Sequence, residues 1–174
     1  MKYLVKFFVI ILFTFHTTLL FSENLIVYIN MNKIMNETTA GKSINLQLEK
    51  INRINIKEFN SIEVKLKEEE TSIIAQKNIL SKEEYSKKIN ALRIKANNYK
   101  NNRQKKINLL TKKRIAASAN LLKKINPILS DFSKENQISM ILPKKNIVLA
   151  KTDLDITDKI IKIINAEIKL INLN

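Results

Sequence analysis

Apolar residues recur every three or four positions through much of this chain, which is the spacing of one face of an α-helix. The first long stripe follows Gly41 and predicts a helix over residues 41–77. Its apolar positions are Ile44, Leu48, Ile51, Ile54, Phe59, Ile62, Leu66 and Ile73. Residues 25–31, before this stripe, form a short run of branched and aromatic side chains. They predict a buried strand, with a short helix over 32–36 after it.

A second helical stripe follows a polar turn at residues 78–81. Ser81 and Glu84 match the Ser-x-x-Glu capping box, which predicts a helix beginning at Lys82. The stripe comprises Tyr85, Ile89, Leu92, Ala96, Tyr99, Arg103, Lys106, Leu110, Ala117, Leu121 and Pro127 or Ile128. Together the two stripes predict a long antiparallel coiled-coil hairpin. The basic residues in its middle predict a thin apolar seam and a mobile distal half.

The pattern changes after Pro127. Residues 137–142 predict a strand, 143–146 a turn and 147–150 a returning strand. Asp155 or Thr157 then caps a predicted terminal helix whose apolar face is rich in isoleucine: Ile156, Ile160, Ile161, Ile163, Ile164 and Ile168. The sequence therefore predicts two short strands and a helix after the hairpin's second arm, and these form the base together with the strand at 25–31.

These elements predict a mostly helical α+β fold. A small β body, formed by residues 23–40 and 134–174, carries an inserted helical hairpin arm at 41–133. A three-stranded sheet of this size buries little apolar surface alone, so its edges are expected to pair with neighbouring subunits. The strand residues expected to mediate this oligomerisation are Ile26, Val27, Ile29, Ile138, Met140, Ile141, Ile147 and Leu149.

Residues 1–22 have the form of a secretory signal peptide. Lys2 and Lys6 precede an apolar run, and Ser22 provides a small residue for cleavage. An uncleaved membrane anchor is the alternative, because the run approaches the roughly 20 residues that span a bilayer. Removing the segment lowers the formal net charge from +15 to +13. The basic character thus belongs to the exported part of the protein.

Positive charge is concentrated on the second arm. Residues 82–124 contain 14 Lys and Arg against two acids, whereas residues 41–77 contain seven against six. Such a helix can be merely a solvated coiled-coil exterior, but so one-sided an excess favours an anionic partner. The cations expected to contact that partner are Lys87, Lys88, Arg93, Lys95, Lys100, Arg103, Lys105, Lys106, Lys112, Lys113 and Arg114.

Several classes of function are disfavoured by composition. The only histidine, His16, lies in the predicted signal, and the chain has no cysteine, so no metal site, disulfide or cofactor is predicted. The acids Asp153, Asp155 and Asp158 fit a helix start better than a catalytic site. Nucleic acid is disfavoured because the chain is exported and lacks an aromatic platform. A binding protein is therefore predicted, and not an enzyme.

Three segments resemble the Skp/OmpH family of periplasmic chaperones: the strand and short helix at 26–50, the turn at 80–89, and the strand pair with its capped helix at 141–165. The resemblance implies a homotrimer in the periplasm whose helical arms surround unfolded outer-membrane proteins without ATP. The cationic arm would attract clients and its apolar residues would retain them. The alternative is a non-chaperone envelope coiled coil that binds anionic lipid or lipopolysaccharide.

Overall fold

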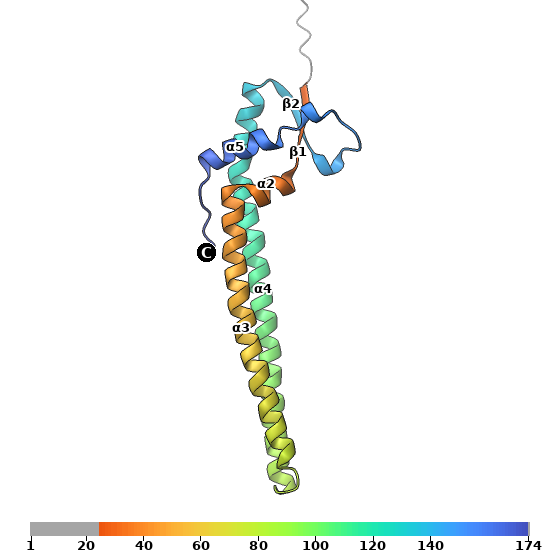
Figure 1. Ribbon diagram of the computed structural model, residues 1–174, viewed down its shortest axis with the longest axis vertical. Helices are drawn as coiled ribbons and strands as arrows, with labels where there is room; N and C mark the ends of the chain where they lie inside the picture. Colours follow the sequence, from red (N-terminus) through yellow and green to blue (C-terminus); the bar gives the residue numbers. More distant parts are fainter. Residues whose placement is uncertain (1–24, 174) are drawn as a thin grey trace, which may run out of the picture.

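A long two-helix arm projects from a small base in the computed structural model, which describes residues 25–173 (Figure 1). The predicted signal at 1–22 lies outside these residues. The elements, in chain order, are β1 (Leu25–Ile29), α2 (Met31–Glu37), α3 (Thr39–Ala75), α4 (Lys82–Glu135), β2 (Ile138–Pro143) and α5 (Thr157–Glu167). The predicted hairpin inserted between the first and second strands is therefore observed.

The sheet joins the two ends of the chain. β1 and β2 pair in parallel, with Ile26 opposite Met140 and Ile29 opposite Pro143. Parallel neighbours need a long crossover connection, and here α2 and the whole arm provide it. The sheet brings both arm helices back to one base.

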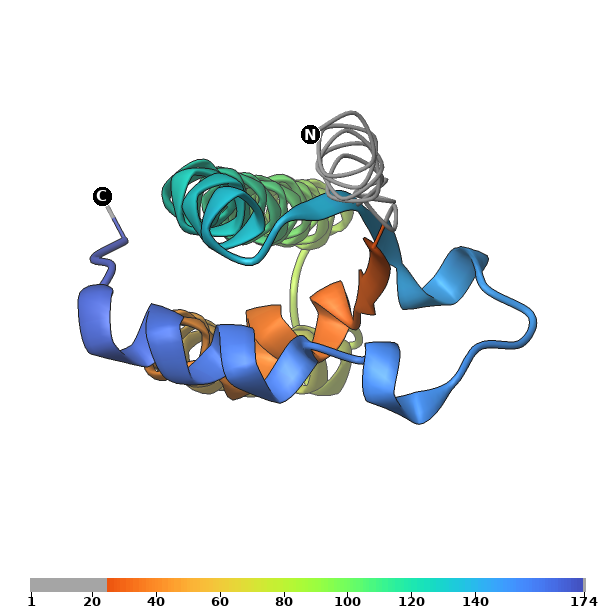
Figure 2. The same cartoon turned by 90° about the horizontal axis from the view of Figure 1, so that it is seen from above.

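The predicted returning strand at 147–150 is not formed, and this part of the sequence prediction was wrong. A 3-10 turn at Lys144–Asn146 follows β2 directly, and the next segment projects away from the body (Figure 2). The second edge of β1 is also occupied, because Tyr28 forms a bridge with Asp155. Residues 147–150 thus have no strand partner within the described chain, and the sheet has two strands instead of three.

The apolar core lies where the base meets the root of the arm. α5 covers this junction with Ile156, Ile160, Ile164 and Ile168, all buried, as its predicted apolar face requires. Beneath it lie buried residues from β1, α2 and the two arm helices: Val27, Ile34, Leu48, Leu121 and Ile125. The core is therefore shared between segments that are far apart in sequence.

The corner between α2 and α3 is tightly constrained. Thr38 is buried and extended, and its hydroxyl accepts a hydrogen bond from the Gly41 amide at 3.2 Å. A Cβ at Gly41 would lie only 2.0 Å from the carbonyl oxygen of Met35. Gly41 thus permits the close approach of backbones expected at the junction of base and arm. Asn165 of α5 accepts from the Thr39 amide at 2.7 Å and holds the corner from outside.

α5 begins at Thr157, but Thr157 does not cap it. The residue in the capping position is Ile156, and no side chain caps the helix there. The Thr157 hydroxyl instead accepts from the Asn30 amide at 2.8 Å, while Asp155 accepts from the Thr157 amide at 3.0 Å. Thr157 is buried, so its hydroxyl satisfies a backbone group of the base and not the start of its own helix.

The arm helices pack along most of the predicted stripes. Ile44, Leu48, Phe59 and Ile73 are buried, but Ile54 is 57% exposed and does not belong to the seam. α4 continues through Pro127 and ends at Glu135. At the tip, the Glu84 amide donates to the Ser81 hydroxyl at 3.2 Å and the Ser81 amide donates to the Glu84 carboxylate at 3.1 Å. The Ser81 hydroxyl also donates to the Glu84 carboxylate at 2.7 Å, and this bond together with the one from the Ser81 amide lowers the pKa of Glu84.

Candidate functional site: the cationic arm

The cations of α4 fall into two groups, and one group lies against α3. Lys95 donates to Glu69 at 2.7 and 2.8 Å, and Arg103 donates to Glu63 at 2.8 Å. Lys106, half-buried, forms an ion pair with Glu58. These three cations therefore hold the helices together, and the acids of the neighbouring helix already neutralise them.

An aromatic and polar cluster surrounds the middle pair. The rings of Phe59 and Tyr99 meet edge to face at 6.2 Å, and the Arg103 guanidinium lies 5.5 Å from the centre of the Phe59 ring. The Tyr99 hydroxyl donates to Glu63 and accepts from Arg103 at 3.1 Å. Desolvation and the Glu63 carboxylate raise the pKa of Tyr99. The two helices are thus joined by ring contacts and polar contacts where the sequence predicts a thin apolar seam.

Two further cations have partners near the tip. Lys87 forms an ion pair with Glu83 one turn away at 2.7 Å, and Lys88 donates to the Gln76 side chain at 2.6 Å. Exposed pairs of this kind contribute little to stability and exchange readily with water. The ammonium groups of Lys87 and Lys88 therefore remain accessible to a partner.

The second group of cations points away from the seam. Within residues 25–173, no carboxylate lies within ion-pair distance of Lys100, Lys105, Lys112 or Arg114, and all four side chains are exposed. Arg93 makes only a long hydrogen bond to Asn90 at 3.5 Å. Lys113 is half-buried beside the C-terminal residues. The eleven predicted client-binding cations therefore do not form one surface.

The acids of α3 that pair with the seam were not predicted as site residues. Glu58, Glu63 and Glu69 pair with Lys106, Arg103 and Lys95, and each pair is centred on residue 82 or 83. Folding the sequence back about residue 82, at the start of α4, brings these opposite charges together. That symmetry is the signal that separates seam cations from outward ones.

Large apolar side chains are also exposed on both arm helices. On α4 they include Ile94, Leu109 and Ile115, and on α3 they include Leu46, Val64 and Ile74. A groove of about 500 Å³ also opens between the helices at mid-arm, where Ile62, Leu66 and Tyr99 line it together with Asn98 and Asn102. The arm thus exposes positive charge, apolar side chains and amide groups to solvent.

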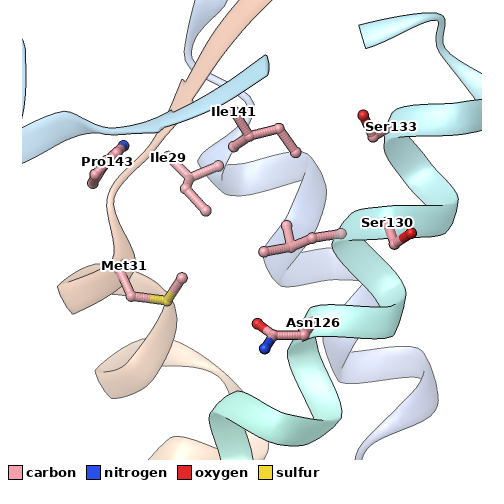
Figure 3. A pocket seen from close by; sticks show the side chains of 8 residues that line it. Ile29, Met31, Asn126, Ser130, Ser133, Ile141 and Pro143 are labelled. Atoms are coloured by element: carbon pink, nitrogen blue, oxygen red, sulfur yellow. The ribbon is translucent and has the colours of Figure 1, made fainter. Parts of the chain in front are cut away.

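The base has a second groove, of about 430 Å³, between the sheet and α4 (Figure 3). Ile29, Met31 and Ile141 point into it from the sheet and α2, opposite Asn126 and Ser130 of α4. Leu129, Ser133 and Pro143 complete its lining. Its surface is therefore mostly apolar and open to solvent.

The predicted oligomerisation residues differ in accessibility. Val27, Ile29 and Ile138 are buried in the core of their own chain, and Ile141 and Ile147 are partly buried. Ile26, Met140 and Leu149 are exposed, and the exposed fractions reach 91% for Leu149 and 104% for its neighbour Val148. Only the outer face of the sheet and the projecting segment can therefore reach another subunit without rearrangement.

Two features of the described residues bear on other kinds of site. None of the helices in residues 25–173 combines the length and apolar character needed to cross a bilayer. The same residues contain no cluster of three His, Cys, Asp or Glu side chains arranged to hold a metal ion.

Comparisons with known proteins agree with this architecture. A profile of the family described as outer membrane protein (OmpH-like) matches residues 25–164. A crystal structure of a candidate outer membrane chaperone (OmpH-like) from Caulobacter crescentus superposes with a TM-score of 0.79 at 18% identity. The match covers 86% of this chain and 89% of that one, and it shows the same fold. No curated protein matches the sequence.

Proposed function

This chain belongs to the OmpH-like family of outer membrane proteins, and we propose that it is an ATP-independent holdase chaperone for unfolded outer-membrane proteins in the periplasm. The observation that carries the proposal is the separation of cations on α4. The seam cations are neutralised by α3, whereas Lys100, Lys105, Lys112 and Arg114 have no acidic partner within residues 25–173. A charge left uncompensated on a projecting arm is available to an anionic client.

The arm supplies reach as well as charge. With 37 residues, α3 extends about 55 Å at 1.5 Å per residue. Long-range attraction by the outward cations raises the rate of encounter with acidic chains. Ile94, Leu109 and Ile115 then provide weak apolar contacts to the alternating side chains of an unfolded β-strand. A surface of this kind retains a client without imposing one geometry on it.

We propose further that the protein acts as a homotrimer joined through its base. Val148 and Leu149 are exposed on a segment that has no strand partner in its own chain. A neighbouring sheet edge would supply that partner, and the segment would then form the strand that its sequence favours. The expected solution mass of the mature protein is three times that of the chain. A monomer would contradict this part of the proposal.

The chaperone role is tested by light scattering of an unfolded outer-membrane barrel diluted from urea without ATP. The parent protein should suppress aggregation. Replacing Lys100, Lys105, Lys112 and Arg114 with Gln should slow client capture by about tenfold at low salt and change it little at high salt. A matched variant with Lys42, Lys50, Lys57 and Lys67 of α3 replaced by Gln loses the same charge. Equal capture rates for the two variants would refute a specific role for α4.

Binding of anionic lipid or lipopolysaccharide is a second candidate function, because the same outward cations also suit phosphate groups. It predicts binding of the mature protein to vesicles that contain an anionic phospholipid or lipopolysaccharide. A protein that binds these vesicles but does not suppress client aggregation would favour this candidate over the chaperone.

A further inference from the structure

The last residues of the described chain form an extended strap beside the root of the arm. After α5, residues 168–173 run back along the arm and do not continue the helix (Figure 1). Ile171 is only 3% exposed and belongs to the apolar core, and Leu173 packs against it. Lys169 and Asn172 face solvent. From Ile171 to Leu173, inward and outward side chains alternate as they do along a β-strand.

The Gln47 side chain makes two hydrogen bonds to the backbone of this strap. The Gln47 amide nitrogen donates to the carbonyl oxygen of Ile171 at 2.7 Å, and the Gln47 amide oxygen accepts from the Leu173 amide at 3.1 Å. A residue in a parallel β-ladder makes the same pair of hydrogen bonds to the two residues flanking its partner. Gln47 thus replaces a neighbouring strand opposite Asn172.

Gln47 is also held by α3. Its amide nitrogen lies within hydrogen-bond distance of the Ser43 hydroxyl at 3.1 Å and of the Ser43 carbonyl oxygen at 3.3 Å. These contacts come from the preceding helical turn and do not involve the strap. These contacts orient the Gln47 side-chain amide independently of the strap.

The groove that the strap occupies is not completely filled. A cavity of about 140 Å³ remains between Asn172 and Leu173 on one side and Ala116, Ala117 and Asn120 of α4 on the other. Small side chains on α4 leave room for a larger residue than the strap provides. We call this region, between Gln47 of α3 and Ala116 to Asn120 of α4, the root groove.

We propose that the root groove is a binding site for an extended peptide with apolar side chains at alternate positions, and that the strap is its displaceable internal ligand. Hydrogen bonds to backbone groups carry no sequence information, so any chain with this alternation can replace the strap. To free the groove, the strap must give up its two backbone hydrogen bonds to Gln47 and the burial of Ile171. That its natural competitor is an unfolded β-strand of a client rests on the proposed function.

The strap can be locked without touching Gln47. The chain has no cysteine, and Asn120 and Asn172 line the same small cavity, so we choose Asn120→Cys with Asn172→Cys as the pair to be joined by a disulfide, and thiol titration verifies that it forms. The probe is a fluorescein-labelled peptide with the sequence of residues 167–174, followed by fluorescence anisotropy. The oxidised full chain should bind it about tenfold more weakly than the same protein after reduction, because the disulfide keeps the strap, the intramolecular competitor, in the root groove. The Asn172→Cys single variant should show no redox dependence.

A gain of binding separates this proposal from a purely structural strap. Ile171→Asp should undock the strap and raise peptide affinity about tenfold, since the internal competitor is removed. Adding Gln47→Leu should reverse the gain, whereas non-specific binding to a loosened protein would not respond. Redox-independent binding in the double-cysteine protein, or no gain in Ile171→Asp, would overturn the proposal.

The two proposals fail separately. If the parent protein suppresses aggregation but the lock does not change peptide binding, the root groove is refuted and the chaperone role stands. If peptide binding follows the lock while the parent fails to suppress aggregation, the groove stands without that client.

Discussion

Arg103 of α4 donates to Glu63 of α3 at 2.8 Å, and both residues also bond to the hydroxyl of Tyr99. A cation within the most basic part of the chain is thus used to fix the pairing of the two arm helices. Pairing of this kind needs a particular helix register, because a shift of one residue would separate the charges.

Arg103→Gln should lower the free energy of unfolding by about 0.5–1 kcal/mol, since the pair is half-exposed and screened by water. Urea denaturation followed by circular dichroism measures the loss. Lys100→Gln removes an outward charge from the preceding turn and should leave stability unchanged. Equal losses in both variants would show that the seam contact contributes nothing specific.

Gly41→Ala should destabilise the protein by about 1–3 kcal/mol, because the new methyl group would collide with the backbone oxygen of Met35. Thr39→Ala, in the same helical turn, replaces an exposed side chain and serves as the control. Thermal unfolding measures both. An unchanged melting temperature for Gly41→Ala would mean that the corner can widen at no cost.

Thr157→Val keeps the shape of a buried side chain but removes the acceptor for the Asn30 amide. An unsatisfied buried amide costs about 1–3 kcal/mol, so this variant should be destabilised by that amount. Thr157→Ser retains the hydroxyl and should recover most of the loss in chemical denaturation. If serine proved as damaging as valine, the methyl group and not the hydrogen bond would be responsible.

The lowered pKa of Asp155 predicts that the folded protein loses stability in acid. Partial burial raises the pKa of its carboxyl, but hydrogen bonds from Thr157 and Lys144 outweigh this and leave the pKa below its ordinary value. The unfolded chain therefore binds the proton more tightly, and the stabilisation is complete above about pH 4 and lost as the pH falls through the lowered pKa. Asp155→Asn should flatten the stability curve in that range. An unchanged acid slope would contradict this assignment.

The arm was predictable from the sequence because its information is local. The stripes through Ile44 and Leu121 and the polar turn at Ser81 each act within a few residues. Ile54 was misassigned because a single stripe does not reveal how two helices wind around each other. The seam pairs were missed for a related reason: opposite charges such as Glu58 and Lys106 become neighbours only after the chain reverses.

The base was less predictable because its structure depends on distant partners. Residues 147–150 have the composition of a strand, yet a strand exists only where another backbone can pair with it. The docking of the strap on Gln47 had no sequence signal at all, because the hydrogen bonds are made to main-chain atoms. Such contacts constrain a position without selecting the residue that occupies it.

The parallel pairing of β1 with β2 sets an order of assembly. Ile29 cannot meet Pro143 until α2 and both arm helices have been synthesised, so closing the sheet is a late and slow step. The helical hairpin depends on nearer contacts and can form earlier. A chain that lacks β2 would therefore carry a formed arm and an unpaired first strand. Its exposed strand edge would make it prone to aggregation, as unfolded outer-membrane proteins are.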